Sequence, residues 1–160
     1  MTMLVLTRFN IFLNSIMTVI VVILVGALTI TVGLQVFFRY VIQSSLIWSE
    51  EISRYFLIWV SFLGASIALR KQSHINVSML LDFLTKRGFG IAAILSYTIS
   101  LVTLLVLSYF GSVIALRNMH QLSVVTKVPM GIVYLCIPIA SLLMLVQIME
   151  NVGKLFHKDE

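Results

Sequence analysis

The chain consists of long apolar stretches separated by short polar segments. A transmembrane helix needs roughly 20 apolar residues to cross the hydrocarbon core of a bilayer. Four stretches meet this requirement or come close to it, and they lie at about residues 11–38, 49–69, 89–116 and 128–149. The pattern therefore predicts an all-α integral membrane protein with four transmembrane helices, built as one membrane domain over residues 1–160.

The second span differs from the others because charged residues lie at its beginning. Its uncharged part, residues 55–69, is only 15 residues long, which at about 1.5 Å per residue is shorter than the hydrocarbon core. We therefore expect the helix to begin near Ser49, with Ser49 as the N-cap and with Glu50 and Glu51 in the first turn. Arg54 then lies one turn later, so an ion pair with either glutamate can form on one helix face.

Two prolines mark the fourth span. Pro129 suits the first helical turn, where a missing backbone N–H costs nothing, whereas Pro138 lies in the interior and predicts a kink. At the second span, Trp48, Tyr55 and Trp59 fall on a common stripe, as is typical of an aromatic belt at the membrane surface.

The segment between the second and third spans, residues 72–85, has apolar residues at helical spacing between flanking cations. This pattern is compatible with a short interfacial helix on the membrane surface. It is equally compatible with an extension of the neighbouring spans, so both interpretations stay open.

Composition agrees with a membrane location. The chain is 60% hydrophobic and only 11% charged, whereas charged residues make up about a quarter of a typical soluble domain. The net charge of +5 does not indicate nucleic-acid binding, because the basic residues lie in loops and are not interleaved with aromatic residues. Seven Lys and Arg residues fall on the side of the termini and four on the other side, so the positive-inside rule predicts that both termini are cytoplasmic.

The spans lack the residues that chemistry in a membrane usually needs. Their interiors contain no Asp, Glu, Lys, Arg or His, and we take their polar residues to be mostly Ser and Thr, with Gln35 close to an end. The three histidines lie in loops or in the tail, and the single Cys136 excludes an intrachain disulfide and a metal cluster. We expect no enzyme, no cofactor in this chain and no transport pathway formed by this chain alone.

Small residues are the positive signal within the spans. Ser61, Ala65 and Ala68 share a face with Gly64 on the second span, and Gly26 and Gly33 are seven residues apart on the first. Such faces let another helix backbone approach closely. They could hold the four helices to one another or receive a different subunit, and the sequence leaves both possibilities open.

Residues 35–80 resemble the small membrane subunit, of the DctQ type, of tripartite ATP-independent periplasmic (TRAP) transporters. In that family an Arg-Tyr pair closes the first span, a Trp with acidic residues and an Arg opens the second, and a Trp, a Gly-Ala pair and an Arg precede a His-Ile. The matching residues here are Arg39, Tyr40, Trp48, Glu50, Glu51, Arg54, Trp59, Gly64, Ala65, Arg70, His74 and Ile75. The chain departs from the family pattern at Asn76, often basic there, and at Ser78, often Asp.

The resemblance implies a set of partners and a place in the bacterial inner membrane. A large multi-span subunit would carry the sodium and substrate sites, and a periplasmic protein would deliver a carboxylate-bearing solute such as sialic acid, a C4-dicarboxylate or a similar organic acid. The small subunit, surrounded by lipid, would brace the large one as part of a stationary scaffold. The alternative function is a free-standing homo-oligomeric pore or carrier lined by Ser and Thr.

The charged cluster at the second span has two possible roles. Glu50, Glu51 and Arg54 can simply complement the helix dipole, pair locally and set the depth of the helix. Alternatively, together with Arg39 across a short loop, they contact the large subunit or the arriving binding protein.

Overall fold

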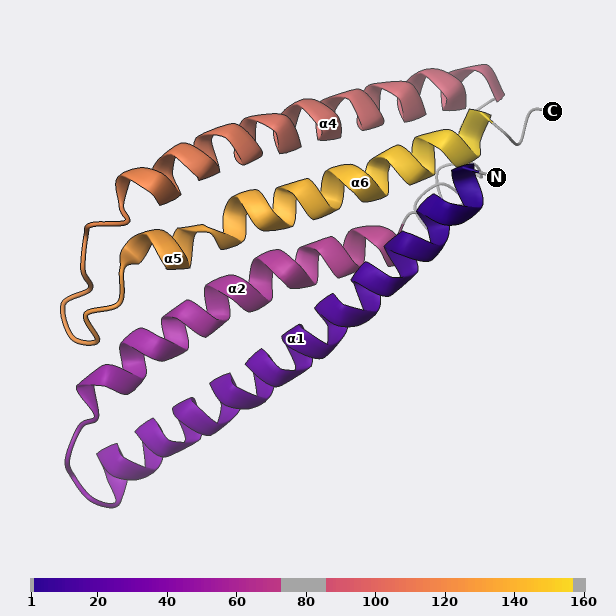
Figure 1. Cartoon of the computed structure of the whole chain (residues 1–160). Helices are drawn as coiled ribbons and strands as arrows, with labels where there is room; N and C mark the ends of the chain where they lie inside the picture. The colour runs from indigo at the N-terminus through magenta and orange to yellow at the C-terminus, as the bar shows by residue number, and fades with distance from the viewer. Residues whose placement is uncertain (1, 73–85, 157–160) are drawn as a thin grey trace.

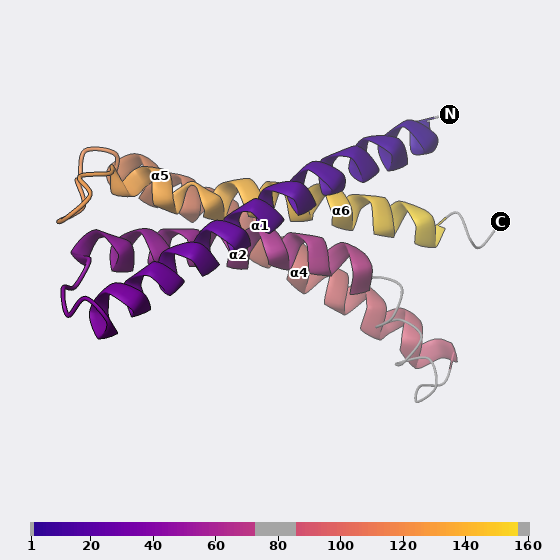
Figure 2. The same ribbon diagram turned by 90° about the horizontal axis from the view of Figure 1, so that it is seen from below.

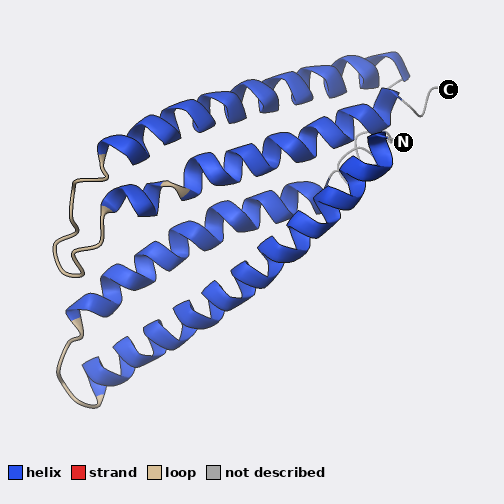
Figure 3. Ribbon diagram, in the orientation of Figure 1, coloured by secondary structure: helices blue, strands red, loops and turns tan. Residues whose placement is uncertain are grey.

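The computed structural model describes residues 2–72 and 86–156. These residues form only α-helices and connecting loops (Figure 3): α1 (Thr2–Tyr40), α2 (Ile47–Gln72), α4 (Lys86–Arg117), α5 (Met130–Tyr134) and α6 (Cys136–Phe156). Four helical stretches are long and apolar enough to cross a membrane, namely Asn10–Tyr40, Ile47–Leu69, Leu95–Arg117 and Met130–Met149. The predicted all-α fold with four spans is confirmed, while the single domain over residues 1–160 stays a prediction.

The helices lie side by side in the order α4, α6, α2 and α1 (Figure 1). The contacts agree with this order, because α1 packs on α2, α2 on α6, and α6 on α4. The start of α1 and the end of α6 lie at one end of the bundle, and the loops 41–46 and 118–129 lie at the other (Figures 1 and 2). Which end faces the cytoplasm stays a prediction.

The four spans differ in how much of their surface is buried. Only 6% of the apolar window of the α1 span is buried, compared with 39% for the α5–α6 span. Large side chains such as Val22, Ile30 and Leu116 are about two-thirds exposed. In a membrane such surfaces meet lipid or another protein, so α1 and α4 present the chain's outer apolar faces.

The fourth span is interrupted where the sequence predicts a kink. Helix α5 ends at Tyr134 and α6 begins at Cys136, because the ring of Pro138 crowds the carbonyl of Tyr134 four residues earlier and its nitrogen carries no hydrogen. The interruption agrees with the predicted effect of Pro138, and the kink itself stays a prediction. Pro129 is the N-cap of α5 and has an extended backbone. It therefore lies one position before the first helical turn, in which the sequence places it.

Two glycines bring α4 close to α5 and α6. A Cβ atom at Gly111 would lie 2.7 Å from Cγ2 of Ile137, and a Cβ atom at Gly131 would lie 2.5 Å from the carbonyl oxygen of Ala115. Real Cβ atoms do not approach other atoms so closely. Among the described glycines, Gly111 and Gly131 are therefore the ones on which close helix contacts depend.

Candidate functional site

Helix α2 begins two residues earlier than predicted, at Ile47. Ser49 consequently lies inside the first turn, where it is completely buried. Its hydroxyl donates a hydrogen bond of 2.7 Å to the carbonyl of Leu46, instead of accepting one from a backbone N–H as an N-cap does. The predicted N-cap role of Ser49 is therefore wrong, and of the two glutamates only Glu50 lies in the first turn.

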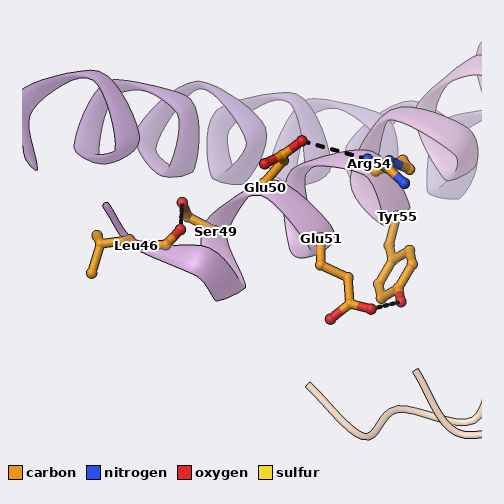
Figure 4. A network of polar contacts seen from close by, with 6 residues as sticks. All are labelled: Leu46, Ser49, Glu50, Glu51, Arg54 and Tyr55. Atoms are coloured by element: carbon orange, nitrogen blue, oxygen red, sulfur yellow. Dashed lines mark hydrogen bonds and ion pairs between the residues drawn. The ribbon is translucent and has the colours of Figure 1, made fainter. Parts of the chain in front are cut away.

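Glu50 and Arg54 form the predicted local ion pair. Oε1 of Glu50 lies 3.6 Å from a terminal guanidinium nitrogen of Arg54 (Figure 4). The two side chains are 69% and 67% exposed, and a pair as exposed as this contributes little to folding stability. Both charges stay accessible to a partner.

Glu51 points away from this pair, toward the loop between α4 and α5 (Figure 4). Its Oε1 accepts a hydrogen bond of 2.8 Å from the hydroxyl of Tyr55, and its Oε2 accepts one of 2.8 Å from the backbone N–H of Thr126. Sδ of Met130 lies 3.4 Å from the same Tyr55 hydroxyl. Glu51 thus ties the start of α2 to a loop 75 residues later in the sequence, and the predicted alternative pairing of Glu51 with Arg54 is not found in the described part of the chain.

The loop 118–129 is folded as a narrow turn. The backbone N–H of Ser123 donates to the carbonyl of Val128 at 2.9 Å, and that of Met130 donates to the carbonyl of Gln121 at 2.8 Å. The hydroxyls of Ser123 and Thr126 lie 2.8 Å apart. We did not predict this loop contact from the sequence, where its only signal is the pair of hydroxyl residues, Ser123 and Thr126.

Several predicted residues meet on one exposed face of α2. We call this face the α2 stripe, and its exposed members are Glu50, Arg54, Leu57, Ser61, Ala65 and Ala68. Their spacing of three or four residues keeps them on one side of a helix. Gly64 lies beside the stripe, half-buried, and a Cβ atom there would meet nothing within 4 Å.

The small residues singled out from the sequence lie mostly on exposed surface, and the glycines among the described ones make no close contact with another helix. Gly26 and Gly33 on α1 also have nothing within 4 Å of a Cβ position, whereas Gly111 and Gly131 do the internal packing. The sequence leaves open whether the small face of α2 packs within this chain or receives a different subunit. In the structure this face is exposed, so it is available to another helix.

The remaining predicted residues lie outside this stripe. Arg39 and Tyr40 are exposed at the end of α1, with the guanidinium carbon of Arg39 6.0 Å from the centre of the Tyr40 ring. Trp48 is 42% exposed, and Trp59 is half-buried. Arg70 and Gln72 belong to the last part of α2. His74 and the rest of the segment 72–85, for which an interfacial helix and an extension of the spans are both open, lie outside the described residues.

Two amide side chains within the spans were overlooked in the sequence analysis. Gln147 in α6 is 4% exposed, and Asn14 in α1 has a buried side-chain oxygen. The polar residues of the spans are mostly Ser and Thr, as expected, but the amides among them are Asn14 and Gln147 as well as Gln35. Within the described residues, no group of His, Cys, Asp and Glu could hold a metal ion.

Comparison with known proteins identifies the family. A family model described as "Tripartite ATP-independent periplasmic transporters, DctQ component" matches residues 28–158. A TRAP transporter small permease protein of Haemophilus influenzae is 31% identical over 135 residues, which cover 82% of each chain. The sialic acid TRAP transporter small permease protein SiaQ of Vibrio cholerae is 29% identical over 108 residues, 68% of this chain and 59% of that protein.

A longer protein also contains a similar segment. The sialic acid TRAP transporter permease protein SiaT of Haemophilus influenzae is 45% identical over 51 residues, which are 32% of this chain and 8% of that protein. The family is a transporter component, not an enzyme. The resemblance seen in residues 35–80 is confirmed, and the chain belongs to the DctQ component family of tripartite ATP-independent periplasmic transporters.

Proposed function

We propose that this multi-pass inner-membrane protein braces the large membrane subunit of a sodium-coupled TRAP transporter, which imports a carboxylate-bearing solute. Membership of the DctQ component family makes it a small permease subunit. The similarity to a segment of the much longer SiaT supports close association with a large permease. The observation that carries the bracing role is the α2 stripe, whose residues are all exposed in the described chain.

The large subunit would place one of its helices along the α2 stripe. Ala65, Ala68 and the neighbouring Gly64 would let that helix approach closely, since side chains of this size keep two backbones near each other in a membrane. Glu50 and Arg54 at the start of the stripe would then fix its register, because exposed charges determine orientation more than affinity.

The end that carries the loops would face the periplasm. This orientation rests on the excess of Lys and Arg at the end of the termini, seven against four. Arg39, the Glu50–Arg54 pair and the loop held by Glu51 would then lie where a solute-binding protein arrives. The solute and sodium sites would belong to the large subunit, and this chain would need no cofactor.

The proposed class of solute rests only on the solutes for which relatives of this chain are named. One relative is named for sialic acid, and another, from Vibrio cholerae, for C4-dicarboxylates. Both kinds of solute carry carboxylates, so we propose an organic acid and leave its selection to the binding protein and the large subunit.

Co-purification tests the proposed docking. The chain is tagged and co-expressed with its large TRAP subunit, and Ala65→Leu is compared with Ser96→Leu, the control on the exposed surface of α4. We expect Ala65→Leu to abolish recovery of the large subunit and solute uptake while its own membrane level stays normal, and Ser96→Leu to change neither. Equal recovery with both variants would contradict docking on α2, and solute flux through this chain alone in liposomes would favour the homo-oligomeric pore.

A further inference from the structure

A buried polar site lies where α1, α2 and α6 meet. Ser66 on α2 is completely buried, and Gln147 on α6 and Met17 on α1 are each 4% exposed. Nε2 of Gln147 donates a hydrogen bond of 3.2 Å to Oγ of Ser66, and that Oγ lies 3.9 Å from Sδ of Met17. One side chain from each of the three helices therefore meets at Ser66.

Two buried side-chain acceptors, one on α6 and one on α1, lack a donor in the described part of the chain. They are Oε1 of Gln147 and Oδ1 of Asn14, and both atoms are buried. Asn14 lies three residues before Met17 and thus on the same side of α1. A buried amide oxygen without a hydrogen bond is costly, and within a membrane span no bulk water relieves that cost.

Exchanging the positions of the oxygen and the nitrogen of the Gln147 amide still leaves one buried polar atom without a hydrogen-bond partner. With the oxygen turned toward Ser66, the Ser66 hydroxyl could donate to it, but the amide nitrogen would then lack an acceptor. In either orientation, one polar atom of a side chain that is 4% exposed needs a partner that the described part of the chain does not supply.

We propose that this junction binds one ordered water molecule, which donates hydrogen bonds to Oε1 of Gln147 and Oδ1 of Asn14. A water has two hydrogens to give, and buried waters typically make about three hydrogen bonds. The described side chains at the junction are neutral, whereas a hard metal cation would need about six oxygen ligands. The water would give α1, the least buried of the four spans, a polar attachment to α2 and α6. The proposal concerns this chain alone and does not depend on the partner assigned above.

The direct test is a high-resolution cryo-electron microscopy map of this chain bound to its large TRAP subunit in lipid nanodiscs. We expect a discrete peak at hydrogen-bond distance from both Gln147 Oε1 and Asn14 Oδ1, unchanged when sodium is replaced by choline. A map of the same resolution without that peak would overturn the proposal. A peak that disappears without sodium would overturn it in favour of a cation.

A second measurement uses the full chain with ¹⁵N-labelled glutamine and asparagine side chains. The signal that Gln147→Met removes is assigned to Gln147, and we expect its amide protons to show cross-peaks to a long-lived water, unlike those of the exposed Gln121. Asn14→Leu should shorten the lifetime of that water several-fold, because one of its acceptors is lost. Absence of a long-lived water at Gln147, or a lifetime that Asn14→Leu leaves unchanged, would contradict the bridging site.

Discussion

The substitution Gly131→Ala tests how α4 is held against the fourth span. A Cβ atom at Gly131 would lie 2.5 Å from the carbonyl oxygen of Ala115, 2.9 Å from Cα of Met119 and 2.7 Å from Sδ of Met119. Two of these three atoms belong to the backbone of the α4 end and its following turn, so they cannot swing away as a side chain can. Accommodation therefore requires α4 and α5 to separate.

The magnitude follows from two opposing effects. Overpacking of this kind costs about 1 to 3 kcal/mol, and backbone contacts this short place it at the upper end, whereas replacing Gly by Ala in a helix gains about 1 kcal/mol. We expect a net loss of about 2 kcal/mol in the free energy of unfolding. The same change at Gly64, where nothing lies within 4 Å, leaves only the favourable helix effect, of at most about 1 kcal/mol.

The assay is equilibrium unfolding of the purified chain in mixed micelles, titrated with a denaturing detergent and followed by helical circular dichroism. Gly131→Ala should unfold at a lower detergent fraction than wild type, and Gly64→Ala at the same or a higher one. If Gly131→Ala proves as stable as Gly64→Ala, the close approach of α4 and α5 is refuted.

Three further predictions concern the loop end of the bundle. Glu51→Gln should speed tryptic cleavage after Lys127 several-fold, because a neutral amide accepts a weaker hydrogen bond from the backbone N–H of Thr126 than a carboxylate does and cannot offer separate oxygens to Tyr55 and Thr126; an unchanged rate would contradict this hold on the loop. Arg54→Glu should leave folding intact, reduce recovery of the large subunit and leave the sodium dependence of residual uptake unchanged. The double variant Glu50→Arg with Arg54→Glu should restore recovery of the large subunit if only the local pair of these two residues matters. It should not restore recovery if Arg54 contacts a carboxylate of the large subunit. The cysteine of the variant Ser45→Cys should react with a membrane-impermeant maleimide in intact spheroplasts. A cysteine that does not react would contradict the proposed orientation, in which the loop end faces the periplasm.

The sequence predicts well what depends on local composition. The four spans follow from apolar length, the interruption of the fourth span follows from Pro138, and the Glu50–Arg54 pair follows from a spacing of four residues on one helix. Each of these features is determined within a few residues of the chain.

What the sequence could not predict depends on contacts between distant segments. In the sequence Glu51 is chemically equivalent to Glu50. Only the position of Thr126, 75 residues later, makes Glu51 the residue that binds the loop. Ser49 has an N-cap residue type, but burial turns its hydroxyl back to Leu46. Among the glycines, spacing drew attention to those of α1 and α2, whereas close approach to neighbouring helices occurs at Gly111 and Gly131.

The most direct test of the bracing role is photo-crosslinking from the α2 stripe. A photoreactive amino acid is placed at Ala65, or at Ser96 on α4 as the control, in the tagged chain co-expressed with its large TRAP subunit. After irradiation of intact membranes, we predict an adduct with the large subunit from position 65 and much less of it from position 96. An adduct only between two copies of this chain, or equal adducts from both positions, would contradict docking of the large subunit on α2.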